Sequence, residues 1–145
     1  MDKFREIRPI VLGVAIKNGK ILVSESIDSV KNQSFCRCLG GGIEFCETSE
    51  MALKREYMEE LGIPISVKNL IKVVENIFEY EGKNAHEIVF LYEINIDDKY
   101  YKDEYKAVED GKDFVAKWVD ISEFVKGNKI IYPTNIITFL EDIIR

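Results

Sequence analysis

The chain has few of the residues that stabilise small secreted domains or cross membranes. It contains three cysteines, three prolines and one histidine in 145 residues. An odd cysteine count argues against a disulfide framework. The first residues also lack the basic and then apolar plan of a signal peptide, so we expect a reducing, cytoplasmic location. No segment approaches the roughly 20 consecutive apolar residues of a membrane span, and we expect no membrane partner.

Basic residues are also in short supply. Lys and Arg total 20 against 26 Asp and Glu, which gives a net charge of −6 and a pI of about 5.0. A broad nucleic-acid interface needs a basic surface, so nucleic acid is an unlikely partner. A small nucleotide-derived substrate held through metal ions stays possible.

The length and composition predict one domain spanning residues 1–145. Apolar residues make up 46% of the chain and charged residues 32%. A domain of this size buries roughly two thirds of its unfolded surface, so it needs neither a disulfide nor a structural metal to fold. No internal repeat or linker divides it.

The cysteines allow one alternative use. Cys36 and Cys38 lie two residues apart in an expected strand and share a face. Together with Cys46 and His86 they could hold zinc, but this spacing fits none of the usual zinc patterns. We favour small, half-buried apolar side chains.

Turn and capping residues mark the first half of the fold. Ile7 to Ser26 reads as a β-hairpin around Asn18-Gly19, a favoured two-residue turn. A short strand near Phe35 leads into a glycine-rich loop. A helix is expected from about Thr48, its N-cap, to Leu61, and it ends at Gly62.

The second half adds strands and two further helices. We expect strands at Ile65–Tyr80, His86–Ile96 and Phe114–Val119, a loop at Asp97–Asp113, and helices at Ile121–Val125 and Thr134–Ile144. Interspersed helices and strands predict the α/β class, with a mixed β-sheet sandwiched between helices (α/β/α).

The first helix has an unusual charge pattern. At 100° per residue, one arc to be buried holds the apolar residues Met51, Leu53, Tyr57, Met58 and Leu61. The opposite arc is expected to hold Glu56, Glu59 and Glu60. Like charges at i and i+4, and acids in the last turn, both destabilise a helix.

Clustered carboxylates suit a hard cation such as Mg²⁺, which takes oxygen ligands and shares substrate phosphates. The triplet Gly40-Gly41-Gly42 lets the backbone pass close to the helix and direct a carbonyl at the same ion. A glycine triplet alone is more often a turn, and an acidic face alone is usually solvated. The combination favours a metal site.

This segment is similar to the Nudix hydrolase signature over all seven fixed positions. The matching residues are Gly41, Glu47, Arg55, Glu56, Glu59, Glu60 and Gly62. Two positions depart from the commonest form: Tyr57 where an aliphatic residue is usual, and Cys46 where many members have glycine. We expect these to adjust packing without removing the chemistry.

The resemblance implies a Nudix fold and the hydrolysis of a nucleoside diphosphate–X substrate with Mg²⁺, or alternatively Mn²⁺, as the cofactor. It implies that Glu56, Glu59, Glu60 and the Gly40 carbonyl bind metal. Gly41, Glu47, Arg55 and Gly62 would support the site. The catalytic base would be Glu56 or Glu59, with Glu104 and Glu109 as alternatives.

Several other residues are candidates for substrate contact. Arg37 could bind a phosphate and Glu44 could reach metal or substrate, although simple exposure is as consistent with the sequence. A structural role is favoured for His86-Glu87. Core packing is favoured over base stacking for the strand aromatics Phe78, Tyr80, Tyr92 and Tyr100.

Two competing functions stay open at this point. A non-catalytic nucleotide sensor of the same fold would usually have lost signature glutamates, which this chain keeps. A diphosphate isomerase would use additional cysteine and glutamate residues. The identity of X depends on pocket shape and, in a possible homodimer, on a neighbouring subunit.

Overall fold

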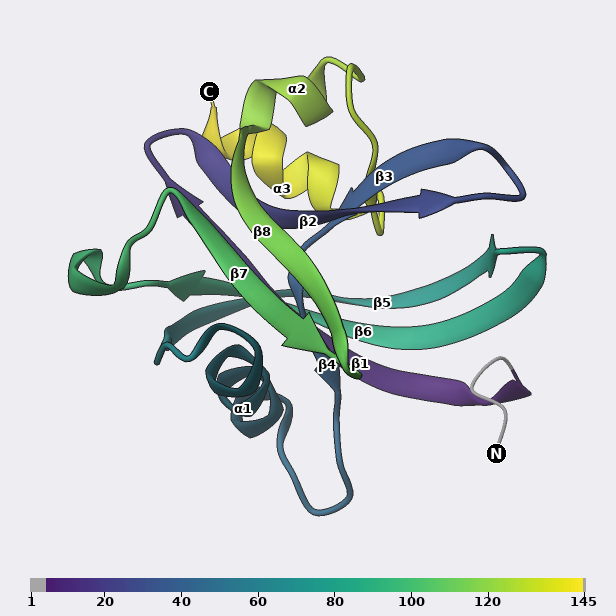
Figure 1. Cartoon of the computed structure of the whole chain (residues 1–145), viewed down its shortest axis with the longest axis horizontal. Coiled ribbons are helices and arrows are strands. Elements are labelled where there is room, and N and C mark those ends of the chain that lie inside the picture. The colour runs from purple at the N-terminus through teal and green to yellow at the C-terminus, as the bar shows by residue number, and fades with distance from the viewer. Residues whose placement is uncertain (1–4, 145) are drawn as a thin grey trace.

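The computed structural model describes residues 5–144, which form a mixed β-sheet with helices on both faces (Figure 1). The strands are β1 (Ile7–Lys17), β2 (Lys20–Asp28), β3 (Gln33–Arg37), β4 (Leu39–Gly42), β5 (Ser66–Tyr80), β6 (Lys83–Asn95), β7 (Glu104–Glu109), β8 (Lys112–Asp120) and β9 (Ile131–Tyr132). The helices are α1 (Ser49–Leu61), α2 (Ile121–Val125) and α3 (Ile136–Ile143), with a 3₁₀ turn η2 (Asp98–Tyr100). The α/β class and the α/β/α arrangement are confirmed. Within the described range, no helix has the length and apolar character needed to cross a membrane.

The centre of the sheet is β1. It pairs in parallel with β6 from Ile7↔His86 to Ala15↔Ile94, and antiparallel with β4 and β2. Its side chains alternate between two hydrophobic cores: Leu12 joins the core beneath α3, and Val11 joins the core beneath α1. Burial on both faces explains why this strand is apolar almost throughout.

The sheet separates into two parts beyond the turn that joins β1 to β2. One part continues through β6 to β5, and the other through β2 to β3, β8 and β9. The tips of the β2–β3 and β5–β6 hairpins meet again on the far side (Figure 1). There, the buried carboxylate of Asp28 accepts from the Glu81 backbone N–H at 3.2 Å, and Lys31 Nζ donates to the Glu79 carbonyl at 2.8 Å.

The capping and turn predictions are confirmed. Asn18 and Gly19 have φ values of 52° and 75°, as the expected hairpin turn requires. Thr48 Oγ1 accepts from the Met51 N–H at 3.2 Å, which caps the N-terminus of α1. Gly62 ends the helix at φ 70°, and its N–H donates to the Met58 carbonyl.

Two predicted loops contain strands. Residues 97–113 contain η2 and the strand β7, which pairs with β8 from Glu104↔Lys117 to Glu109↔Lys112. The turn between these strands is Asp110-Gly111, a strong hairpin signal that the sequence contained. The glycine triplet lies in β4, where Gly40, Gly41 and Gly42 pair with β1.

The predicted buried arc of α1 is right for Leu53 and Tyr57 and wrong for the two methionines. Met51 and Met58 are 56% and 49% exposed, whereas Glu60 is 9% exposed. The helix packs through Ala52, Leu53, Tyr57 and Glu60. At 100° per residue Glu60 falls between Leu53 and Glu56, so it belongs to the packed side and not to an opposite, solvated side.

Candidate active site

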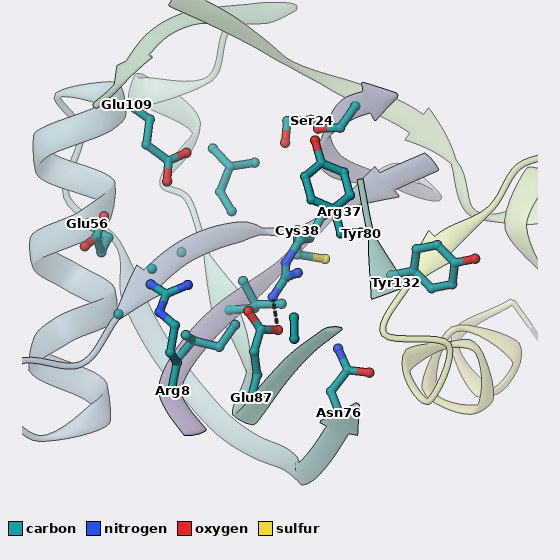
Figure 2. Close-up of a pocket in the computed structure, with 18 of the residues that line it drawn as sticks. Arg8, Ser24, Arg37, Cys38, Glu56, Asn76, Tyr80, Glu87, Glu109 and Tyr132 are labelled. Carbon is teal, nitrogen blue, oxygen red and sulfur yellow. Dashed lines mark hydrogen bonds and ion pairs between the residues drawn. The ribbon is translucent and has the colours of Figure 1, made fainter. Parts of the chain in front are cut away.

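A cavity of about 800 Å³ lies between the two separated parts of the sheet. Its volume is within the range of small-molecule pockets. Glu56 on α1 and Glu109 on β7 lie at one end, and Tyr80 and Tyr132 lie at the other (Figure 2). The cavity therefore joins the acidic helix to an aromatic region of the sheet.

The contact between β4 and α1 requires glycine at position 41. A Cβ atom there would lie 2.4 Å from Cδ of Glu56. Without a side chain at Gly41, the Glu56 carboxylate rests directly against the strand. This close approach gives a physical reason for glycine at this position.

Arg55 ties the segment after β4 to the helix. Its Nε donates to Glu47 Oε2 at 2.7 Å and its Nη2 donates to Glu47 Oε1 at 2.9 Å, a bidentate pair. Nη2 also donates to the Gly42 carbonyl at 3.0 Å, and Glu47 accepts from the Glu44 N–H at 3.0 Å. The hydrogen bonds from Arg55 lower the pKa of Glu47 to about 2.

The other side of the same guanidinium contacts the acidic residues of the helix. Arg55 Nη1 lies 2.9 Å from Glu56 Oε1, 3.3 Å from Glu59 Oε2 and 3.8 Å from Glu44 Oε1. The pKa of Arg55 is raised, first by its hydrogen bond with Glu47. One fixed charge thus orients several carboxylates.

Glu60 is the most unusual ionisable group of the helix. It is buried, and its Oε1 atom has no hydrogen-bond partner among the described residues. Burial, a hydrogen bond with Glu56 and the nearby charge of Glu109 raise the pKa of Glu60 to about 9. An unpartnered buried oxygen is costly and needs an explanation beyond folding.

These residues fit a hard divalent cation. Carboxylate oxygens are the donors that Mg²⁺ and Mn²⁺ prefer, and the unpartnered Glu60 oxygen would gain a ligand. Across residues 5–144, no group of three or more His, Cys, Asp or Glu side chains is already gathered as a metal cluster. Glu56 and Glu59 contact Arg55 in this structure.

The cysteines lie in different environments. Cys36 and Cys38 are buried in the core beneath α3, and burial raises the pKa of Cys38 to about 12, which disfavours the thiolate that zinc needs. Cys46 is exposed, contrary to the half-buried position expected. Its φ of 67° lies in the left-handed region, which favours glycine.

The middle and far end of the pocket combine predicted and unexpected residues. Arg37 Nη2 donates to Glu87 Oε1 at 2.7 Å across the gap between β3 and β6. Phe78 and Tyr80 line the pocket, together with His86. Tyr92 and Tyr100 pack in the core beneath α1 instead.

Of the remaining acidic candidates, two line the pocket and one does not. Glu44 lines the pocket with an exposed side chain, and Glu109 lines it from β7. Glu104 is exposed, pairs in register with Lys117, and is not among the residues that line the pocket.

Sequence reasoning missed several pocket residues, among them Arg8, Asn76 and Tyr132. These positions follow no motif, and only the fold brings them together. The contact made by Glu87 had a usable signal. Glu87 occupies one of the alternating buried positions of β6, and a charge on the buried face of a strand needs a partner.

Comparison with known proteins agrees with this architecture. The family model described as NUDIX domain matches residues 7–137. A MutT NUDIX hydrolase from Burkholderia pseudomallei superposes with a TM-score of 0.65 at 22% identity, over 94% of this chain and 98% of that one. A NUDIX-family hydrolase from Clostridium perfringens superposes with a TM-score of 0.64 at 17% identity, over 97% of this chain and 99% of that one. An ADP-ribose pyrophosphatase from Streptococcus suis superposes with a TM-score of 0.62 at 8% identity, over 97% of this chain and 93% of that one.

The structural matches show a shared fold, and the family model defines the class of protein. The chain belongs to the NUDIX domain family, since that model covers most of its length. The predicted family and the predicted class of enzyme, a Nudix pyrophosphohydrolase, are confirmed.

Proposed function

We propose that this protein is an Mg²⁺-dependent hydrolase that cuts the diphosphate linkage of a nucleoside diphosphate–X substrate. The products would be a nucleoside monophosphate and phosphorylated X. The observation that carries the proposal is the unpartnered, buried oxygen of Glu60 beside the carboxylates of Glu56 and Glu59. A helix packed for stability alone would not bury a carboxylate there.

Glu56, Glu59 and Glu60, with the carbonyl of Gly40, would hold Mg²⁺ or Mn²⁺. Such a cation, when bound, would offset the negative charge of the diphosphate oxygens and lower the pKa of a water molecule. The bidentate pair between Arg55 and Glu47 supports the proposal because it braces the carboxylates from behind.

Proton transfer would fall to a carboxylate at the same end of the pocket. Glu56 or Glu59 would accept the proton of the attacking water, as both side chains line the pocket. Glu109 is the alternative base, because it reaches the same end from β7. Glu104 is not favoured, since it lies outside the pocket lining.

The arrangement of the pocket supports a nucleotide-derived substrate. The acidic end would take the diphosphate through metal, and the opposite end offers aromatic rings to a base (Figure 2). Phe35 contacts Tyr80 at a centroid distance of 5.9 Å and Tyr132 at 5.4 Å. Aromatic faces stack on any nucleobase, so this end does not by itself select one.

A substrate panel with Mg²⁺ tests the proposal. It should include nucleoside triphosphates, nucleotide sugars, ADP-ribose and dinucleoside polyphosphates, with products identified by mass spectrometry. Water enriched in ¹⁸O would show which phosphorus is attacked. Tight nucleotide binding without turnover would instead support a sensor, and rearranged product without hydrolysis would support an isomerase.

A further inference from the structure

The basic side chains that line the pocket do not have equal freedom to bind a ligand. They are Arg8, Lys31, Arg37 and Arg55. Arg55 is engaged by Glu47, Glu56 and Glu59, and Lys31 Nζ donates to a backbone carbonyl at the hairpin tips. The question is which of the two remaining arginines meets the negative charge of a substrate.

Arg37 forms a pair that is close to neutral. Its Nη2 lies 2.7 Å from Glu87 Oε1, and the Glu87 side chain is only 7% exposed. A desolvated carboxylate at this distance offsets most of the positive charge of the guanidinium. What the pair still offers is a row of N–H donors beside a carboxylate acceptor.

Arg8 differs in both position and partners. It extends from β1 toward the acidic helix, and its Nη2 lies 3.7 Å from the point where a Cβ of Gly42 would stand. No hydrogen bond or ion pair joins it to another residue within 5–144. Figure 2 shows Arg8 beside the acidic end of the pocket, while Arg37 lies nearer to Tyr80.

A diphosphate in this pocket would meet more acidic than basic side chains. Metal ions would offset part of that repulsion, and a guanidinium with its donors unused would offset more. Arginine binds phosphate oxygens bidentately, and such charge-assisted bonds are about twice as strong as neutral ones. The cation best able to do this is the one with no carboxylate partner.

We propose a division of labour in which Arg8 binds the substrate diphosphate, and the Arg37–Glu87 pair contacts the uncharged, base-bearing part as a donor–acceptor pair. This assignment differs from the sequence-based expectation, in which Arg37 could contact a phosphate. A pair that both donates and accepts matches the edge of a nucleobase, whose donors and acceptors lie side by side. The inference rests on the proposed function.

The phosphate half is tested with a ligand that has no base. Methylenediphosphonate with Mg²⁺ should bind in calorimetry, and Arg8→Gln should weaken its binding by about tenfold or more. Arg5→Gln removes the same charge from an exposed position outside the pocket and should change binding little. The double variant Arg37→Gln with Glu87→Gln keeps the pair neutral, and it should leave diphosphonate binding within about threefold.

The base half is tested with nucleotides that share a phosphate chain and differ in base. The Arg37/Glu87 double variant should raise KM and change the ratio of kcat/KM between bases. Arg8→Gln should lower kcat/KM for every base by a similar factor.

The proposed division of labour would be overturned if Arg8→Gln and the Arg37/Glu87 double variant weakened methylenediphosphonate binding equally, or if the double variant weakened it more. If wild-type protein hydrolyses nucleotides and Arg8→Gln behaves like wild type, only this inference fails. If wild-type protein neither hydrolyses the panel nor binds diphosphonate, the proposed function fails with it.

Discussion

Helices α1 and α3 cover opposite faces of the same sheet but are built differently. The packed side of α3 is wholly apolar, with Ile136 and Leu140 buried in the core. The packed side of α1 carries Leu53 and Tyr57, and it also carries Glu60. One helix therefore places only hydrocarbon against the sheet, while the other places an ionisable group there.

The difference indicates where selection for function outweighs stability. Burying a carboxylate without a partner lowers stability, so a helix that contributed only packing would have an apolar residue at position 60. Functional sites commonly break the local rules that the rest of a fold obeys. On this view α3 should respond to substitution through stability, and α1 through activity.

The largest effect is expected on activity, at Glu59. Its side chain is 60% exposed and contacts Arg55, so Glu59→Gln removes a proposed metal ligand and no core packing. Turnover with Mg²⁺ should fall by about a thousandfold, or roughly 4 kcal/mol in the activation barrier. Glu50→Gln, on the exposed first turn of the same helix, is the matched control. Full activity in Glu59→Gln would show that the metal assignment is wrong.

Leu140 on α3 should give the converse result. It is fully buried, and Leu140→Ala would leave a cavity that costs about 2–5 kcal/mol of unfolding free energy. Urea unfolding monitored by circular dichroism measures this loss. Turnover per folded molecule should stay near wild type well below the melting temperature. A large fall in kcat at full folding would contradict the separation of roles between the helices.

Replacing Glu60 with a residue that cannot ionise should make the metal-free protein more stable. In metal-free protein at pH 8, Glu60→Gln should raise the unfolding free energy by about 1–3 kcal/mol, because glutamine does not ionise and so does not stabilise the unfolded chain at this pH. The same variant should lose the stabilisation that added Mg²⁺ gives to wild type. Chemical denaturation with EDTA and then with Mg²⁺ measures both effects.

The pH dependence of that difference has a definite sign. The folded-state pKa of Glu60, about 9, exceeds the ordinary carboxyl value of 4.5. The contribution of Glu60 to the stability of metal-free wild type should therefore be fully present below about pH 4.5 and be lost as the pH rises toward 9. The advantage of Glu60→Gln should grow over that range. An advantage that stays constant from pH 5 to 9 would contradict the raised pKa.

Local signals in the sequence predicted much of the fold. Thr48, Gly62 and Asn18-Gly19 act through their own backbone geometry, so helix ends and the first hairpin could be placed without tertiary information. Strand β7 was missed although Asp110-Gly111 marked its turn, because its polar residues were read as a loop.

The site was predictable only where residues act within one segment. The signature brought together Glu47, Arg55 and the acidic residues of α1, all of which lie in one continuous segment of chain. Arg8 and the partnership of Arg37 with Glu87 join β1, β3 and β6. Such contacts depend on how the sheet separates, which no local pattern encodes. The burial of Glu60 was missed for the same reason.

The smallest effect is expected at the brace between Glu47 and Arg55, which links α1 to the strand before it. The pKa of Glu47 is lowered to about 2 from an ordinary value of 4.5, first by its hydrogen bond with Arg55. Its contribution to stability should be present above pH 4.5 and should be lost as the pH falls toward 2.

A double-mutant cycle of Glu47→Gln and Arg55→Gln, followed by urea unfolding at pH 7 and pH 3, isolates this coupling. The interaction free energy should be favourable at pH 7 and smaller at pH 3. Because the Arg55 guanidinium stays charged at both pH values, the change must come from protonation of Glu47. A coupling that is equal at the two pH values would mean that the brace acts through shape and not through charge.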